Sequence, residues 1–256
     1  MEWPKTALTL RRTIDAEFLN TVANDADVRQ WLGGDGTLDL SAQMANPLNL
    51  AGASDSGGFV ALSLGDGRYD IHSLFLPTHG TEAIRMMREG LDYLFATTDA
   101  TELLTKVPED NAAADGLAQL AGFSRIFSSR MVWSAGVTKL IHVGSLHIDE
   151  WAMHSKTCLC MGRWLHDQFA AVIAAQPHSR LPAHSDEDET HDRMAGAATM
   201  MIRAGNVAKG VLFYNRWASF AGYPIIKWLR DHPVILDLDG MTVEVTGTGI
   251  EVLQCQ

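Results

Sequence analysis

A carboxylate and an imidazole stand two residues apart in a segment with the pattern of a β-strand. Asp70 and His72 lie in residues 69–76, a largely apolar run that ends at Pro77. Because side chains two positions apart on a strand point to the same face, these two side chains are expected to meet. Histidine, which titrates near pH ~6.5, suits proton removal close to neutrality. We interpret Asp70 and His72 as candidate catalytic residues; an ordinary polar pair on the surface of a hairpin is the competing interpretation.

The corner after this strand is the second chemical feature. Residues 78–83 separate the strand from a helix expected over residues 84–95. Backbone N–H groups are unpaired at the start of a helix and attract anions, and a glycine lets a phosphate come close to the backbone. We therefore expect a site for a phosphorylated cofactor, formed by Leu74, Phe75, Leu76, His79, Gly80, Thr81, Glu82, Ala83 and Ile84. A plain strand-to-helix turn is the alternative, because the Glu82 carboxylate would repel a phosphate.

A sheet and several helices must position these residues, and the hydrophobic pattern of the first half predicts both. An Asp66-Gly67 pair indicates a hairpin turn just before the strand that carries Asp70. The expected strands cover residues 6–14, 58–64, 69–76, 102–107 and 123–133. The expected helices cover residues 16–23, 28–32 and 84–95 and a stretch after Asn111, and residues 39–58 are rich in loop.

The second half has a different pattern, mainly of helices. Helical stretches are expected over residues 148–176, 192–203 and 217–229, a polar break over residues 177–189, and strands over residues 207–214 and 249–253. A second hairpin is expected at Asp239-Gly240. The sequence thus predicts an α+β fold with a mixed central sheet and crossover helices, followed by a mainly helical second half that ends in a β-hairpin. We place the boundary between two domains at residues 135 and 136.

Two motifs resemble those of the GNAT acyl-coenzyme-A transferases. Leu74-Phe75-Leu76-Pro77 followed by His79-Gly80-Thr81-Glu82-Ala83 is similar to the strand and pyrophosphate loop of that family. Residues 111–123, which end in Ala121-Gly122-Phe123, are similar to the helix that begins with asparagine in the family. The resemblance covers residues 7–135, about half of the chain, and its second motif is the better match.

The resemblance implies a function and a cofactor. It implies a GNAT-like acyl-CoA-binding domain over residues 1–135 that transfers an acetyl group from acetyl-CoA to an amine. The loop residues and Asn111 would hold the cofactor, and the backbone of residues 74–76 would hold its pantetheine arm. Two departures leave catalysis open: Gly80 is the one loop glycine present, and the family's tyrosine acid falls on Ala118.

Two shorter runs are similar to GNAT-like proteins encoded by tailed bacteriophages. They are Thr-Lys-Val-Pro-Glu-Asp-Asn at residues 105–111 and Tyr-Asn-Arg-Trp-Ala at residues 214–218. This likeness implies a viral protein that resides in the host cytoplasm or in the phage virion. It also keeps a second interpretation open, a non-catalytic GNAT-fold component of a virion or its assembly. Residues 136–256 would then dock on a virion partner or on another copy of the chain.

Composition limits the partners. The 256 residues include 31 acidic and 20 basic ones, a net charge of −11, which opposes attraction to nucleic acid and to anionic lipid. A third interpretation, a GNAT-related enzyme that modifies DNA bases, is disfavoured on the same ground. The charge favours a cationic acceptor such as a polyamine or lysine. No apolar run is long enough to span a bilayer, and three cysteines do not form a disulfide framework.

Three clusters in the second half have competing interpretations. Residues 184–192 combine two histidines with a run of acidic residues, and His154, Cys158 and Cys160 lie close together in sequence. A metal site is conceivable at either, but a solvated loop and buried thiols fit these spacings better, so we expect no metal. Residues 214–217 are either a partner-binding surface or a packed structural segment.

Overall fold

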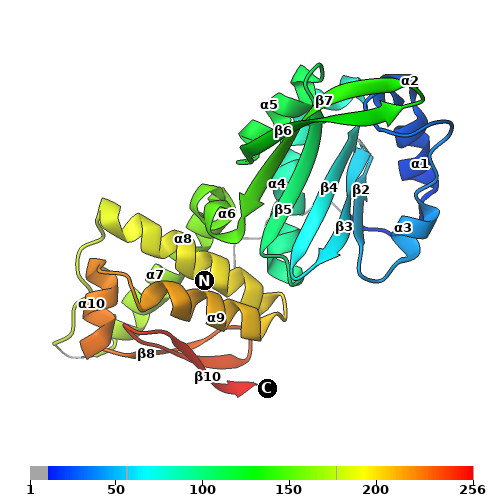
Figure 1. The fold of residues 1–256 in the computed structure, drawn as a ribbon. Coiled ribbons are helices and arrows are strands. Elements are labelled where there is room, and N and C mark those ends of the chain that lie inside the picture. The colour runs from blue at the N-terminus through cyan, green and yellow to red at the C-terminus, as the bar shows by residue number, and fades with distance from the viewer. Residues whose placement is uncertain (1–10, 56, 177, 256) are drawn as a thin grey trace. The chain divides into compact units, whose positions relative to one another are not determined.

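The computed structural model describes residues 11–55, 57–176 and 178–255, which form two compact units (Figure 1). We call the first the sheet unit; it contains the described residues up to Leu94 and residues 99–151. The second, the helical unit, contains residues 95–98 and the described residues from Ala152 onward. No helix among the described residues has the length and apolar character needed to cross a membrane.

The sheet unit is built on one seven-stranded sheet. Its strands lie in the order β1 (Arg11–Arg12), β2 (Leu50–Ser54), β3 (Gly57–Gly65), β4 (Arg68–Phe75), β5 (Glu102–Pro108), β7 (Val137–His147), β6 (Ser124–Ser134). Neighbouring strands are antiparallel except β4 and β5, which are parallel. The helix α4 (Gly80–Thr97) connects this parallel pair, as a crossover connection must.

Local sequence explains several boundaries in this unit. Asp66 and Gly67 both adopt positive φ, 53° and 71°, so the tight turn between β3 and β4 forms where the Asp-Gly pair predicts it. The helices are α1 (Glu17–Asn24), α2 (Ala26–Arg29), α3 (Ser41–Ala45), the 3₁₀ turn η1 (Pro77–His79), α4 and α5 (Ala112–Leu120). The Asp25 side chain caps α2 by accepting from the Asp27 amide.

The two faces of the sheet are covered differently. Leu74 on β4 and Val60 on β3 belong to a buried cluster that also contains Leu19 and Val22 of α1. On the other face, a Cβ added to Gly90 of α4 would lie 2.7 Å from the Phe59 ring, so β3 and α4 are in close contact there. Even-numbered residues of β4 therefore face α1 and α2, and odd-numbered ones face α4.

The helical unit packs four helices with a small sheet. The helices are α7 (Lys156–Ala174), α8 (Asp186–Arg203), α9 (Val207–Ala218) and α10 (Pro224–Asp231), and α6 (Ile148–His154) leads into them. The strands β8 (Val234–Asp237), β9 (Met241–Val245) and β10 (Ile250–Cys255) form an antiparallel sheet in the order β10-β9-β8. Gly162 and Gly196 let α7 and α8 approach closely, since a Cβ on Gly196 would lie 1.9 Å from the Cys158 carbonyl oxygen.

The predicted fold class is confirmed. A mixed sheet with crossover helices precedes a mainly helical half, and the Asp239-Gly240 turn forms the expected second hairpin between β8 and β9. The expected strand over residues 6–14 lies partly outside the described residues, and its described part contains β1. The stretch over residues 39–58, expected to be rich in loop, also contains α3 and β2.

One expected strand in the second half needs correction, and the domain boundary stays a prediction. The strand expected over residues 207–214 is wrong, because these residues begin the helix α9. Gly210, Phe213, Tyr214 and Ala218 are its buried residues, and they recur at helical spacing. The sheet unit also continues to Trp151, beyond the boundary that we expected at residue 135. The cause is the strand β7, which was not predicted and which pairs with β5 and β6.

Candidate functional site

The parallel strands β4 and β5 stay together only briefly. Their ladder has three pairs, Arg68↔Glu102, Tyr69↔Leu103 and Asp70↔Leu104. Beyond this point β4 continues to Phe75 and β5 to Pro108 without further pairing between them. An opening in the sheet follows, and the backbone groups of β4 and β5 that face it do not bond to each other.

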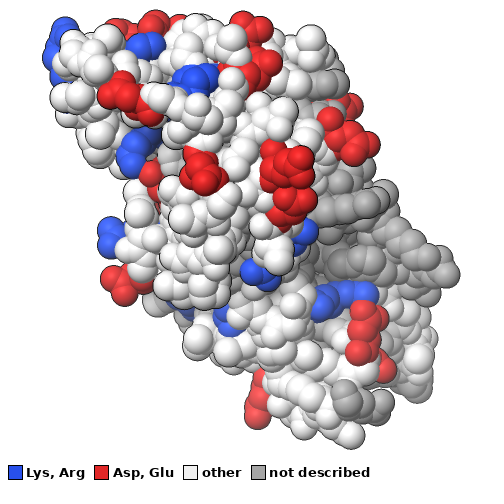
Figure 2. Space-filling model, turned by 90° about the vertical axis from the view of Figure 1, so that its right-hand side faces the viewer, with Lys and Arg blue, Asp and Glu red and all other residues white. Residues whose placement is uncertain are grey.

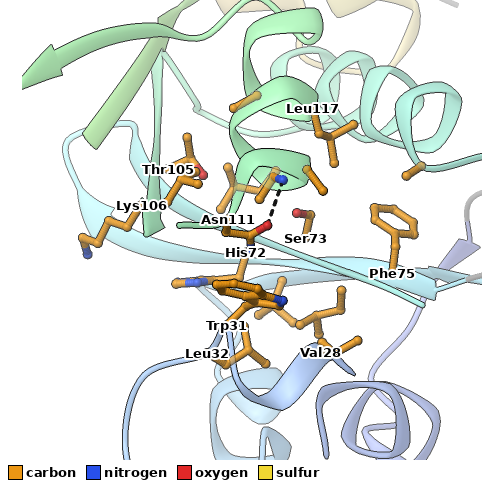
Figure 3. A pocket seen from close by; sticks show the side chains of 18 of the residues that line it. Val28, Trp31, Leu32, His72, Ser73, Phe75, Thr105, Lys106, Asn111 and Leu117 are labelled. Carbon is orange, nitrogen blue, oxygen red and sulfur yellow. Dashed lines mark hydrogen bonds between the residues drawn. The ribbon is translucent and has the colours of Figure 1, made fainter. Parts of the chain in front are cut away.

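A cavity of about 650 Å³ occupies this opening. Its walls come from both faces of the sheet: Trp31 and Leu32 follow α2 on one face, while Ala83 of α4 and Leu117 of α5 lie on the other. Figure 3 shows Val28, Trp31 and Leu32 on one side of the strands and Asn111 and Leu117 on the other. The cavity can hold an elongated ligand that reaches through the sheet.

Asp70, His72 and Lys106 form a charged cluster where the two strands separate. Lys106 Nζ donates to Asp70 Oδ2 at 2.5 Å, and His72 Nε2 lies 3.5 Å from the same oxygen. Burial tends to raise the pKa of Asp70, but the contacts with His72 and Lys106 outweigh it and hold that pKa below its usual range. The second oxygen, Oδ1, is buried without a partner among the described residues. Asp70 is thus an ionised carboxylate behind a partly exposed imidazole.

His72 faces one mouth of the cavity. It shares the face of β4 with Leu74, which packs against α1, and it pairs across the ladder with Val60 of the same cluster. His72 therefore points toward α1 and α2. Ser73 and Phe75 belong to the face that is covered by α4. A proton acceptor at one mouth and a helix start at the other give the cavity two chemically distinct ends.

The corner after β4 contains the start of α4. The 3₁₀ turn η1 ends at His79, and α4 begins at Gly80, so the first backbone N–H groups of the helix lie at this end of the cavity. A Cβ on Gly80 would meet no atom within 4 Å, so the space beside it is open. Arg85 donates to Glu82 Oε2 at 2.5 Å and to Glu89 Oε1 at 2.5 Å. The Glu82 carboxylate is thus paired with a guanidinium, which weakens the repulsion that we expected from it.

Asn111 has a structural contact as well as a place in the cavity wall. Its side-chain Oδ1 accepts from the Ala114 amide at 3.1 Å and caps α5. This bond, drawn in Figure 3, fixes the helix start against the opening. Ala118, one turn beyond Ala114 on α5, also lines the cavity and brings no ionisable group to it.

The structure brings together most of the predicted site residues. Those that line the cavity are His72, Leu74, Phe75, Leu76, Gly80, Ala83 and Asn111. Asp70 stands behind His72, whereas Glu82 and Ile84 are on α4 and do not belong to the wall. The side chains of His79 and Thr81 lie outside the described part of the structure. Sequence reasoning missed Lys106 and Trp31, although Lys106 lies at an even spacing from Glu102 and Leu104 on the expected strand.

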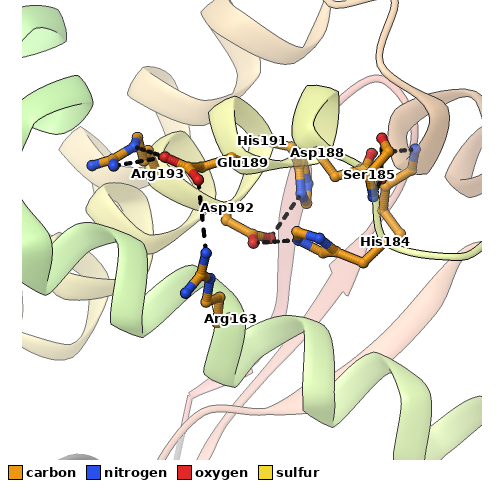
Figure 4. A network of polar contacts seen from close by, with 9 residues as sticks. Arg163, His184, Ser185, Asp188, Glu189, His191, Asp192 and Arg193 are labelled. Atoms are coloured by element: carbon orange, nitrogen blue, oxygen red, sulfur yellow. Dashed lines mark hydrogen bonds and ion pairs between the residues drawn. The ribbon is translucent and has the colours of Figure 1, made fainter.

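A second polar network lies inside the helical unit (Figure 4). Asp192 is fully buried, and its Oδ2 is 2.7 Å from His184 Nε2. His191, also buried, lies 3.0 Å from the Tyr214 hydroxyl through Nε2 and 3.9 Å from Asp192 through Nδ1. Burial tends to raise the pKa of Asp192, yet the two histidines lower it below its usual range. Burial alone raises the pKa of Tyr214.

This network joins α8 to α9 and to the segment before α8 within one unit. Among the described residues, no group of three His, Cys, Asp or Glu side chains is arranged to hold a metal ion. Within the segment of residues 214–217, Tyr214 is buried, Asn215 accepts from the Ile250 amide at 2.6 Å, and Trp217 stacks on Tyr223, whereas Arg216 is exposed. The structural interpretation therefore accounts for this segment.

Comparisons with known proteins give matches of structure only. No family model and no curated protein sequence matches the chain. Spermidine N-acetyltransferase from Vibrio cholerae, solved with CoA and spermine, is similar at 13% identity over 56% of this chain and 96% of that one, with a TM-score of 0.49. A GNAT-family acetyltransferase from Bacillus anthracis is similar at 14% identity over 54% and 93%, with a TM-score of 0.45. Sequence identities this low do not carry residue roles from these proteins to this chain. The site residues are therefore assessed from their own geometry.

Proposed function

We propose that this protein is an acyltransferase that moves an acetyl group from acetyl-CoA to the nitrogen of an amine. The observation that supports it best is the opening between β4 and β5, where a cavity of about 650 Å³ has walls on both faces of the sheet. Two reactants can therefore enter from opposite mouths and meet between the strands. His72 at one mouth and the start of α4 at the other match an amine and a phosphorylated cofactor.

The cofactor would lie on the face covered by α4 and α5. Backbone N–H groups in the first turn of α4 would hold its pyrophosphate, because the unpaired groups and the helix dipole favour an anion there. Leu117 and Ala118 offer an apolar wall for the pantetheine arm, and Asn111 keeps their helix in place. Leu74 and Phe75 pair with β3 on one edge of β4, and the backbone groups of residues 74–76 on the other edge, toward β5, would bind the arm and the developing oxyanion.

The amine would approach from the α1–α2 face, where His72 removes its proton. The nitrogen attacks the thioester carbonyl carbon, the C–N bond forms, and the C–S bond then breaks. The departing thiolate takes a proton from water, because Ala118 supplies none. Asp70 is a positioning residue that orients His72 and stabilises its charged form, and Lys106 keeps Asp70 ionised.

Calorimetry with CoA tests the cofactor site. Ala118→Trp fills the cavity, whereas Ala112→Trp places the same side chain on the same helix at an exposed position outside it. We expect the wild type and Ala112→Trp to bind CoA and Ala118→Trp to bind at least roughly tenfold more weakly, a loss of about 1.4 kcal/mol. Absence of CoA binding by the wild type, or equal binding by all three, contradicts the proposal.

A non-catalytic component of a phage particle is the second candidate, and the absence of an acid at Ala118 favours it. In both candidates we propose the sheet unit as the acyl-CoA-binding domain, and in the second the helical unit docks on a virion partner or another copy. The two differ in one measurement. A catalyst releases free thiol from acetyl-CoA in the presence of an amine, whereas a scaffold does not and co-purifies with virions.

A further inference from the structure

We infer that the acceptor of this site is an apolar amine with a single positive charge, and not a polyamine. This inference rests on the acyl transfer proposed above and concerns the mouth onto which His72 opens. The net charge of −11 led to the opposite expectation, a polycationic acceptor. The side chains around the mouth decide the matter, because an acceptor must be desolvated there before its nitrogen can attack.

The walls of this mouth are mainly apolar, and Gln43 adds one uncharged polar side chain. The apolar part is formed by Val28, Trp31, Leu32, Leu38, Leu40 and Leu62. Val28 is a buried member of the core cluster of α1, and the four leucines pack against that cluster. Figure 3 shows Val28, Trp31 and Leu32 together beneath β4. Because the walls are continuous with the core, their shape and polarity are fixed before a ligand binds.

Few charged groups are available to receive a polycation. Among the described residues that line the cavity, Asp27 is the only carboxylate, and its side chain is exposed at the start of α2. Asp70 already interacts with Lys106 and His72. One ammonium group can be placed near Asp27 during entry. A second one, deeper in the cavity, would have Asp70 as its nearest carboxylate and would be repelled there by Lys106, which already pairs with Asp70.

The aromatic ring at the mouth does not supply a second cation site either. Lys139 Nζ lies 4.7 Å from the centroid of the Trp31 ring and 3.0 Å from Asp110. A cation therefore already covers one face of this ring, and it would repel another. The ring is left as an apolar surface, suited to an alkyl or aryl group.

The acidic surface of the chain does not replace a counter-charge inside the cavity. On the face drawn in Figure 2, acidic side chains are spread among uncharged and basic ones. Surface charges attract a cation over a distance of about 8 Å at physiological salt and do not neutralise one inside a cavity. The apolar walls also favour the neutral amine over the ammonium, and the neutral amine is the nucleophile.

A matched pair of acceptors tests the inference. Hexylamine and hexamethylenediamine have the same carbon chain and differ in one ammonium group. In protein saturated with CoA, we expect hexylamine to protect against thermal unfolding and the diamine to protect less. With acetyl-CoA, we expect kcat/KM to rise roughly fourfold per methylene from propylamine to hexylamine. We expect it to fall at least roughly tenfold from hexylamine to the diamine. Equal or better use of the diamine or of spermidine, or no protection by hexylamine, overturns the inference.

A variant reverses the expected preference. Leu38→Asp puts a carboxylate in the wall, and the backbone at this position remains held by Asn24, whose amide side chain bonds both the N–H and the C=O of Leu38. Leu48→Asp places the same charge at an exposed position outside the cavity. We expect the ratio of kcat/KM for the diamine to kcat/KM for hexylamine to rise at least roughly tenfold in Leu38→Asp and to stay unchanged in Leu48→Asp. CoA binding distinguishes failure of this inference from failure of the proposed function. If CoA binds but hexylamine is not preferred over the diamine, only the inference fails. If CoA does not bind, the proposed function fails.

Discussion

Replacement of His72 by glutamine tests the chemical role of the cluster at the end of the β4–β5 ladder. Glutamine keeps a side chain of similar size that can still hydrogen-bond to Asp70, but it cannot accept the proton of the acceptor amine. If His72 is the base, His72→Gln lowers kcat for acyl transfer and leaves the affinity for CoA unchanged. The reason for the second expectation is that the proposed pyrophosphate site, at the start of α4, lies on the opposite face of β4.

The expected size of the effect follows from the exposure of the base. A positioned general base contributes roughly 10²–10⁴ in rate, which corresponds to about 3–5 kcal/mol at 1.36 kcal/mol per factor of ten. The side chain of His72 is 36% exposed, so water can reach the amine and replace part of its function. We therefore expect a loss near the lower end, roughly a hundredfold or about 3 kcal/mol.

Release of free thiol from acetyl-CoA, followed from acid to alkaline pH, is the assay. In the wild type the rate should fall on the acidic side as the base becomes protonated, and this acidic limb should disappear in His72→Gln. Asp70→Asn serves as the companion variant. It should shift the acidic limb of the pH profile, and it should lower the rate less than His72→Gln does, because Asp70 acts through His72. A His72→Gln variant that retains the acidic limb and stays within about threefold of the wild-type rate refutes the assignment.

Three further outcomes concern stability. Because the pKa of Asp70 is held below its usual range, its ion pairs stabilise the fold above pH ~4. The urea midpoint of the wild type should therefore exceed that of Asp70→Asn at neutral pH, and the difference should shrink as the pH falls below 4, whereas a constant difference contradicts the ion pairs. Gly196→Ala should destabilise by about 1–3 kcal/mol because its Cβ meets the facing helix, whereas Gly116→Ala in open space should be neutral or stabilising in the same denaturation assay. Tyr214→Phe should lower the free energy of unfolding by about 1–3 kcal/mol, because it removes the partner of buried His191 Nε2; an unchanged value argues that the contact has no energetic role.

Local patterns predicted much of the fold. The Asp66-Gly67 and Asp239-Gly240 pairs gave correct turns, because few residues other than Gly, Asn and Asp adopt positive φ readily. The contact between Asp70 and His72 followed from the period of two along a strand. Asn111 was placed at a helix start, where its side chain caps α5. Each of these features depends on residues close together in sequence.

The features that escaped prediction depend on distant residues. The strand β7 lies between β5 and β6, so its place in the sheet is fixed by pairing and not by its own pattern. The apolar residues at the start of α9 suited a strand equally well, and the choice of helix reflects packing: a Cβ on Gly210 would lie 2.7 Å from the Ala198 carbonyl oxygen. The role of Lys106 was hidden because Asp70 is 36 residues away in sequence.

The end of the β4–β5 ladder links the fold to the chemistry. The last pair is Asp70↔Leu104, and Lys106, two residues further along β5, reaches back to Asp70 across the opening. A buried carboxylate is unfavourable unless its charge is compensated, and well-packed apolar residues at such a place are often as stable or more stable. Here one oxygen of Asp70 serves both cations, while the other is buried without a partner among the described residues. The contacts with His72 and Lys106 nevertheless hold the pKa of Asp70 below its usual range, so the charge is compensated in the fold. An ionised carboxylate beside a cavity and in contact with a partly exposed histidine is the arrangement that the proposed proton transfer at His72 requires.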